Sequence, residues 1–99
     1  MPRVLFTISY SIEPQKREAY LQHVQTLKQH FASLGRTDYS VYEVKGKKNH
    51  FTEVFLSGSV EEYDALEDNH DEKAEELIRR LEEFVDKGGM KYSTMFEAV

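Results

Sequence analysis

The fold is decided by the stretch Val4-Leu5-Phe6-Thr7-Ile8-Ser9-Tyr10-Ser11-Ile12. Large apolar side chains occupy every second position of this stretch, and mostly small or polar ones fill the gaps. Because a β-strand points alternate side chains to opposite faces, one face of this segment is suited to a hydrophobic core. The other face carries Leu5, Thr7 and Ser9, has no charged residue, and would suit contact with a partner or the lining of a cavity. We therefore predict a central strand of a small sheet.

The composition limits the class of protein. The chain has 99 residues, of which 39% are apolar, and its net charge is −5. This length predicts one domain over residues 1–99, with a modest core that association with a second copy would help to stabilise.

The chain has no cysteine, which excludes disulfides, thiolate metal sites and cysteine nucleophiles. No stretch approaches the roughly 18 apolar residues of a membrane span, so we expect a soluble, cytoplasmic protein without a membrane partner.

The charge is unevenly distributed along the chain. Residues 1–58 carry 8 Lys and Arg against 5 Asp and Glu, a net of +3, whereas residues 59–99 carry 5 against 13, a net of −8. Phosphate neutralisation supplies most non-specific affinity for nucleic acid, so no nucleic-acid partner is predicted. The basic turn 45–48 lacks a glycine-rich loop that leads into a helix, and we interpret it as a solvated hairpin tip. The acidic run 61–76 lacks the spacing of a calcium loop and is interpreted as a charged outer face.

The sequence contains signals for the two ends of the first helix and for the hairpin that follows it. Glu13-Pro14 marks a helix start, because proline tolerates the first helical position, and Gly35 marks its end. Between these signals, apolar residues recur at helical spacing, and they are Tyr20, Val24, Leu27, Phe31 and Leu34. Two strand-like runs follow at 39–45 and 51–58, and the Gly- and Asn-containing segment 46–50 joins them as a hairpin. The second run is largely apolar on both faces, which is typical of a central strand.

The C-terminal part predicts two helical segments and a last strand. Ser59 to Glu62 fits a capping box, in which the serine and the glutamate satisfy each other's backbone N–H groups. The helical pattern starts at Tyr63 and returns strongly from Ala74 to Val85. We expect a break at 67–71, where capping residues cluster, although one continuous helix is the alternative. Residues 90–99 then form the last strand.

The element order is therefore β-α-β-β-α-β. This order predicts an α+β ferredoxin-like sandwich, a four-stranded antiparallel sheet with helices on one face and with the first and third strands central. The uncovered face would expose Leu5, Val54 and Leu56, with Val41 a further candidate, and soluble monomers usually avoid such a patch. We predict a homodimer whose two sheets face each other.

With these elements in place, the chain resembles the dimeric α+β barrel group and, within it, the antibiotic biosynthesis monooxygenase-like family. The resemblance rests on three segments, which are Ile12-Glu13-Pro14 before the first helix, Ser40-Val41-Tyr42-Glu43-Val44, and Ser57-Gly58-Ser59 followed by Glu61, Glu62 and Tyr63. The family includes oxygenases that use no metal or organic cofactor, haem-degrading monooxygenases, isomerases and many small proteins of unknown role. The resemblance therefore implies an architecture and does not choose a reaction.

The same resemblance indicates that the chain lacks two of the three residues with which relatives degrade haem. Haem-degrading members use an asparagine on the first strand, a tryptophan near the end of the third strand and a helical histidine. The first two positions here correspond to Ile8 and Ser57, and only the histidine has a counterpart, His70. We therefore predict no cofactor and no metal. In the cofactor-free oxygenases the third strand carries an asparagine that faces the pocket, and this chain has Glu53 there.

Glu53 is the leading candidate for chemistry. By alternation it shares a face with Phe51 and Phe55, and the resemblance points that face toward the helices. Desolvation there would raise the pKa of the carboxyl group and suit a general base. Tyr10 and His70 are candidate orienting groups. The alternatives are structural, because Glu53 would pair with a tyrosine hydroxyl or a lysine, or the strand register would turn it to solvent, and His70 lies among capping residues.

The remaining candidates would line a ligand site between sheet and helices. They are Phe6, Ile8, His23, Phe55, Ser57 and Tyr63. Two functions stay open. The first is a cofactor-independent oxygenase or isomerase that acts on a small aromatic or enolisable molecule, and the second is a non-catalytic dimeric module that binds a small apolar or aromatic ligand or a protein partner. A cavity of roughly 300 Å³ or more beside Glu53, Tyr10 and His70 would favour the enzyme.

Overall fold

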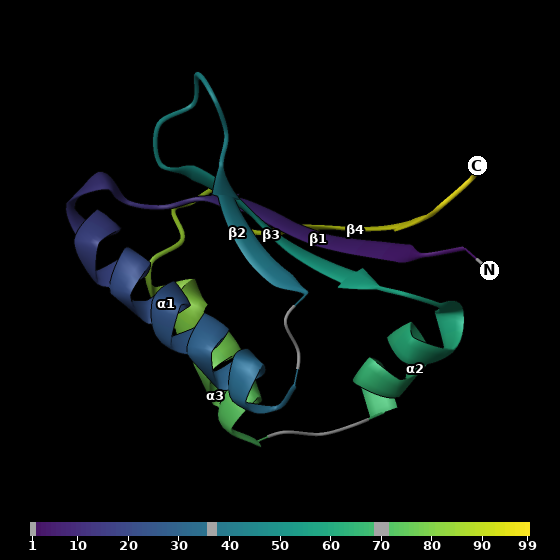
Figure 1. Cartoon of the computed structure of the whole chain (residues 1–99). Helices are drawn as coiled ribbons and strands as arrows, with labels where there is room; N and C mark the ends of the chain where they lie inside the picture. The colour runs from purple at the N-terminus through teal and green to yellow at the C-terminus, as the bar shows by residue number, and fades with distance from the viewer. Residues whose placement is uncertain (1, 36–37, 69–71) are drawn as a thin grey trace.

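The first strand lies in the middle of the sheet, as its two-faced pattern predicts. The computed structural model describes residues 2–35, 38–68 and 72–99, with only the backbone at 66–68. In it, β1 (Val4–Ser11) pairs antiparallel with β3 (His50–Ser57) on one edge and with β4 (Lys91–Phe96) on the other. The fourth strand, β2 (Tyr39–Glu43), pairs with the outer edge of β3, so the order is β2-β3-β1-β4. All labelled helices lie on one side of this sheet (Figure 1). The predicted α+β ferredoxin-like fold is confirmed.

The first helix supplies most of the layer that covers the sheet. A 3-10 turn at Pro14–Lys16 leads into α1 (Arg17–Ser33), so the proline begins the helix as predicted. Leu34, expected on the apolar stripe, is instead exposed, because the helix ends at Ser33 and Gly35 takes a left-handed φ of +82°. The buried residues of α1 are the other four of the stripe, Tyr20, Val24, Leu27 and Phe31.

Two further helices follow β3. The helix α2 (Val60–Asp68) begins at a capping box, in which the Ser59 hydroxyl accepts a hydrogen bond from the Glu62 N–H at 3.2 Å. The glutamate reaches one residue further back than expected, since Glu62 Oε2 accepts from the Gly58 N–H at 2.7 Å. The second helix of this pair, α3 (Glu72–Arg80), buries Ala74 and Leu77 against the core. The two predicted helical segments are thus separate elements, but residues 67 and 68 of the predicted break belong to α2, and its remaining positions, 69–71, lie outside the described residues.

The helix expected to run to Val85 ends earlier. A 3-10 turn at Leu81–Glu83 follows α3, and Val85 forms an isolated antiparallel bridge with Ile12. The Glu13 N–H donates a hydrogen bond to the Phe84 carbonyl at 3.0 Å, and the Asp86 N–H donates one to the Ser11 carbonyl at 2.8 Å. These sheet-like bonds with the end of β1 replace the helical ones, so tertiary pairing overrides the helical pattern. β4 is likewise shorter than expected, because β1 begins at Val4, opposite Phe96.

The two faces of the sheet have different roles. The helix side carries the core, and its β1 members are Val4, Ile8 and Tyr10. The open side carries Leu5, Val54 and Leu56, as predicted, whereas Val41 lies opposite Glu53 on the helix side and packs against the core. The prediction that Val41 lies on the open face was therefore wrong, because the pairing of β2 with β3 turns Val41 to the helix side. Its neighbour Tyr42 lies on the open face instead and is exposed. No helix within the described ranges is long and apolar enough to cross a membrane.

The capping box gives a test of local stability. Glu62→Ala should lower the free energy of unfolding by about 1 kcal/mol, because it removes the acceptor for the Gly58 N–H. Glu61→Ala is the matched control, since both glutamates lie in the first turn of α2 and meet the same helix dipole. Urea unfolding followed by circular dichroism gives both values. Equal losses in the two variants would contradict a contribution from this bond.

Candidate functional site

Glu53 lies at the centre of the helix side of the sheet. Its neighbours in the ladder are Ile8 on β1 and Val41 on β2, and its side chain is 0% exposed. The alternating pattern of β3 places it there, because Phe51 and Phe55 flank it on the same face. The structure therefore turns Glu53 toward the core, the orientation that the family resemblance implied, and not toward solvent.

The carboxyl group of Glu53 is satisfied on one of its two oxygens. The Tyr39 hydroxyl donates a hydrogen bond of 2.5 Å to Glu53 Oε1, while Oε2 is buried without a partner in the described part of the chain. Burial raises the pKa of Glu53 above its ordinary value, and the hydroxyl groups of Tyr39 and Tyr10 oppose part of that effect. A carboxyl group in such a place favours the neutral acid more than an exposed one does, which suits transfer of a proton.

Three buried tyrosines surround this carboxyl group. The hydroxyls of Tyr10 and Tyr20 are 2.7 Å apart, and Tyr39 bonds Glu53 directly. Burial raises the pKa of all three phenols, and the negative charge of Glu53 adds to this for each of them. These phenols therefore remain neutral at ordinary pH and act as hydrogen-bond partners, not as bases. The sequence identified Tyr10 and a tyrosine partner for Glu53, but it did not identify Tyr39 or Tyr20 as members of the cluster.

A second group of rings lies further along the same face. The Phe6 ring is 5.8 Å from Phe55 and 6.3 Å from both Tyr63 and Tyr92, measured between centroids. The Tyr63 hydroxyl lies 3.3 Å from Thr94 Oγ1, which ties α2 to β4. Phe6, Phe55 and Tyr63 are each only partly buried. Such rings offer flat apolar surface to an aromatic molecule, so the structure brings together three of the predicted ligand-binding residues.

Two further candidates lie near the core with different surroundings. Ser57 is buried opposite Val4, and its hydroxyl oxygen has no hydrogen-bond partner among the described residues. Ile8 is buried directly beside Glu53. A buried hydroxyl without a partner is costly in a folded protein, so Ser57 is a natural contact for a polar atom of a ligand.

Of the two histidine candidates, only His23 lies in the part of the chain that the structure describes. His23 Nε2 is 2.6 Å from the Leu77 carbonyl, and its ring lies 5.5 Å from Phe84, so His23 connects α1 to α3. His70 lies outside the described residues. Within those residues, no group of three or more acidic or histidine side chains is arranged to hold a metal ion.

Open pockets of 410, 440 and 360 Å³ are found on the surface of the described structure. The first opens on the uncovered face of the sheet, the second lies at the basic hairpin, and the third lies near the turn before β4. None of these three is lined by Glu53 or Tyr10, so none of them is the cavity that would favour the enzyme over the binding module.

Comparison with known proteins supports the architecture. A conserved protein from Methanosarcina mazei superposes with a TM-score of 0.79 at 15% identity, over 98% of this chain and 94% of that one. An antibiotic biosynthesis monooxygenase gives a TM-score of 0.75 at 13% identity, over 97% and 98%. This chain shares their fold. A dimeric ferredoxin-like protein from an uncultured marine organism gives 0.63 at 16% identity, over 100% and 90%.

These likenesses confirm the predicted resemblance at the level of the fold. Identities this low do not transfer a reaction, since the same fold carries many activities. No family model matches the sequence, and no curated protein matches it either.

The raised pKa of Glu53 predicts a pH dependence of stability. The folded state holds the Glu53 proton more tightly than the unfolded state, whose glutamate pKa is about 4.3. The stabilisation is therefore complete below that value and is lost as pH rises through the folded pKa. Relative to Glu53→Gln, the wild type should lose free energy of unfolding as pH rises from about 4.3.

Urea unfolding at a series of pH values measures this difference. Glu18→Gln, a substitution of an exposed glutamate on α1, is the control for loss of one carboxyl group. A constant difference between wild type and Glu53→Gln across the series would contradict a raised pKa.

Proposed function

We propose that this protein is a homodimer that binds a small aromatic or enolisable molecule between sheet and helices and removes a proton from it with Glu53. The reaction class is that of a cofactor-independent oxygenase or isomerase. The observation that carries the proposal is the completely buried carboxyl group of Glu53, with one oxygen bonded to Tyr39 and the other without a partner in the described chain.

The chemistry follows from the environment of that carboxyl group. A base in an apolar site has a raised pKa and accepts a proton more readily than an exposed glutamate does. In an isomerisation, Glu53 would take a proton from the carbon between the carbonyl and the double bond of a β,γ-unsaturated ketone and return it at the far end of the resulting dienolate. In an oxygenation, the carbanion would form a C–O bond to dioxygen, a second substrate, and the protonated peroxide would lose water by cleavage of its O–O bond to leave a carbonyl group. Tyr10 is a candidate to orient the substrate by hydrogen bonding.

The aromatic group beside this site supports the choice of ligand. Phe6, Phe55 and Tyr63 present partly exposed rings, and Ser57 offers a buried hydroxyl without a partner in the described structure. A flat molecule with one polar substituent would match both features.

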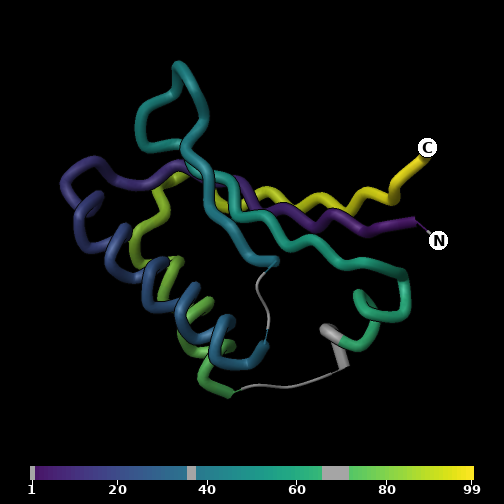
Figure 2. Tube along the Cα trace, in the orientation of Figure 1, coloured from purple at the N-terminus to yellow at the C-terminus, as the bar shows by residue number. Residues whose placement is uncertain are grey.

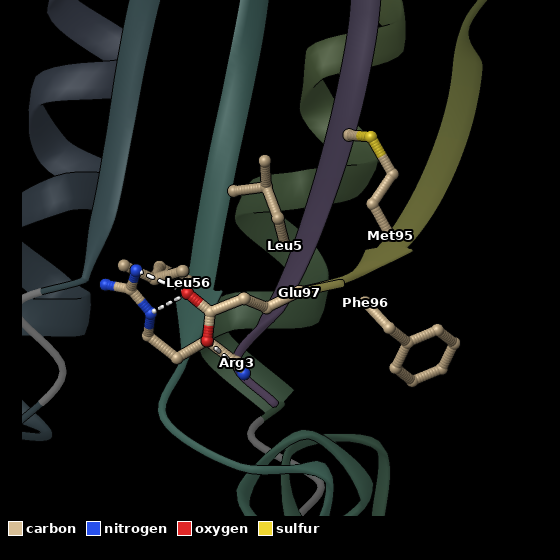
Figure 3. Close-up of a pocket in the computed structure, with 6 residues that line it drawn as sticks. All are labelled: Arg3, Leu5, Leu56, Met95, Phe96 and Glu97. Carbon is tan, nitrogen blue, oxygen red and sulfur yellow. Dashed lines mark hydrogen bonds and ion pairs between the residues drawn. The ribbon is translucent and has the colours of Figure 1, made fainter. Parts of the chain in front are cut away.

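The open face of the sheet supports a homodimer. Leu5, Leu56 and Met95 occupy adjacent positions on the uncovered sides of β1, β3 and β4, and they line the 410 Å³ pocket with the Arg3–Glu97 ion pair at its edge (Figure 3). Leu56 is 38% and Met95 45% exposed. Apolar surface of this kind, rimmed by charge, is typical of an interface. The occupant that fits best is the same face of a second copy, because a two-fold interface is self-complementary.

The dimer can be tested by adding a charge to this face. Leu56→Lys should raise the dissociation constant of the dimer by about tenfold or more, because the ammonium group would lose water on association. Light scattering at micromolar concentrations should then report a larger monomer fraction. Leu21→Lys on α1 is the matched control, since Leu21 is 41% exposed and lies away from the sheet. A monomeric wild type, or equal effects of both variants, would contradict the proposed interface.

Proton abstraction can be tested with 2-tetralone, which is both aromatic and enolisable. The wild type should accelerate exchange of the protons beside the carbonyl for deuterium, followed by NMR in heavy water. Glu53→Gln should reduce the rate by about a hundredfold or more, because the amide cannot accept the proton. Tyr10→Phe should reduce it less, and Glu18→Gln should leave it unchanged.

The non-catalytic binding module is the second candidate. The hydrogen bond from Tyr39 to Glu53 favours it, because the bond gives the carboxyl group a structural partner. Under this alternative, 2-tetralone would bind and perturb the NMR signals of Phe6 and Phe55 without any increase in the exchange rate. An exchange rate in Glu53→Gln equal to that of the wild type would also reject Glu53 as the base.

A further inference from the structure

The hairpin between β2 and β3 stands clear of the rest of the molecule (Figures 1 and 2). Two successive turns build it, in which the Lys47 N–H donates to the Val44 carbonyl and the His50 N–H to the Lys47 carbonyl, each at 3.1 Å. Gly46 and Asn49 take left-handed φ values of +84° and +66° at the third positions of these turns, where such values are required. The loop therefore has a defined shape.

A charged cluster fixes the base of this hairpin to α1. The Arg17 guanidinium donates to both oxygens of Glu43, at 2.6 and 2.8 Å, and to Asn49 Oδ1 at 2.9 Å. Its carbon atom Cζ lies 5.5 Å from the centre of the Phe51 ring, and Glu43 also accepts from the Asn49 N–H. Arg17 holds the pKa of Glu43 at about 2, so the pair remains ionised at any ordinary pH.

Beyond this cluster, the positive charge of the hairpin is not neutralised. Arg17 and Glu43 balance each other, whereas Lys45, Lys47 and Lys48 are exposed and form no ion pair within 4.0 Å in the described structure. These three lysines, with Gly46, Arg17 and Glu43, line the 440 Å³ pocket. A local charge of +3 thus surrounds a concave site on a chain whose net charge is −5.

The backbone of the loop adds further donors. The N–H groups of Val44, Lys47, Asn49 and His50 are used inside the hairpin. Those of Lys45, Gly46 and Lys48 have no acceptor in the part of the chain that the structure describes. Unused N–H groups in a tight turn, beside ammonium groups, favour an oxyanion, because several short charge-assisted hydrogen bonds form to one small group.

We propose that this hairpin binds the phosphoryl group of a soluble small molecule. A phosphate monoester carries about −1.5 to −2 charges at pH 7, on oxygens that face several directions, so it matches three separate lysines better than a carboxylate ligand does. The acidic remainder of the chain, with a net charge of −8 in residues 59–99, repels a nucleic acid or an anionic membrane surface. A small ligand that touches only the tip avoids this repulsion. The site is independent of Glu53 and of the reaction proposed above.

Inorganic pyrophosphate is the probe for this site. Added to the isotope-labelled wild-type protein at low ionic strength, it should cause saturable NMR shifts confined to residues 44–49. The triple variant Lys45→Gln, Lys47→Gln, Lys48→Gln should bind about tenfold more weakly or worse, while Lys87→Gln, a lysine in another exposed turn, should bind as the wild type does. The same spectra show directly that each variant is folded.

Three results would overturn the proposal. The first is the absence of saturable shifts at the hairpin, and the second is equal affinity in the wild type and the triple variant. The third is co-sedimentation with phosphatidylcholine vesicles that contain phosphatidic acid, without any binding of pyrophosphate, because the ligand would then be a lipid surface. Binding of pyrophosphate with the stated order of affinities supports the site, whatever the 2-tetralone experiment finds.

Discussion

The structure depends on the pairing of β1 along both of its edges. Because β3 and β4 are both in register with β1, every side chain of the three strands is committed to one face. The helices cover only one of these faces, so the register that buries Ile8 and Tyr10 also leaves Leu5, Leu56 and Met95 uncovered. One constraint thus produces the core, the buried carboxyl group and the apolar open face.

Glu53 is the energetic exception within this core. A buried carboxyl group costs free energy unless it is neutral or well bonded, and here Tyr39 satisfies one oxygen while burial raises the pKa. An apolar residue at this position would in turn leave the buried Tyr39 hydroxyl without its acceptor. The acid and the three tyrosines around it therefore depend on one another, and this cluster is where we place the proposed chemistry.

The site around Glu53 and the hairpin between β2 and β3 differ in how their charges are balanced. At Glu53, desolvation dominates and the surrounding phenols stay neutral. At the hairpin, solvent is present and Arg17 neutralises Glu43, which leaves three lysines as excess charge. The fold shared with an antibiotic biosynthesis monooxygenase does not decide what either region does, because identity with that protein is 13%.

The sequence alone determined the element order, the central position of β1 and β3, and the face that Glu53 shares with Phe51 and Phe55, since these follow from periods of two and 3.6 residues. Only the tertiary structure decided that Tyr39 is the partner of Glu53, that Val41 faces the core and that α3 ends before Phe84. Local sequence patterns could not decide these three features, because each depends on which segment lies alongside. The register of β2 on β3 sets the positions of Tyr39 and Val41. Backbone hydrogen bonds from Glu13 to Phe84 and from Asp86 to Ser11 replace the last helical turn.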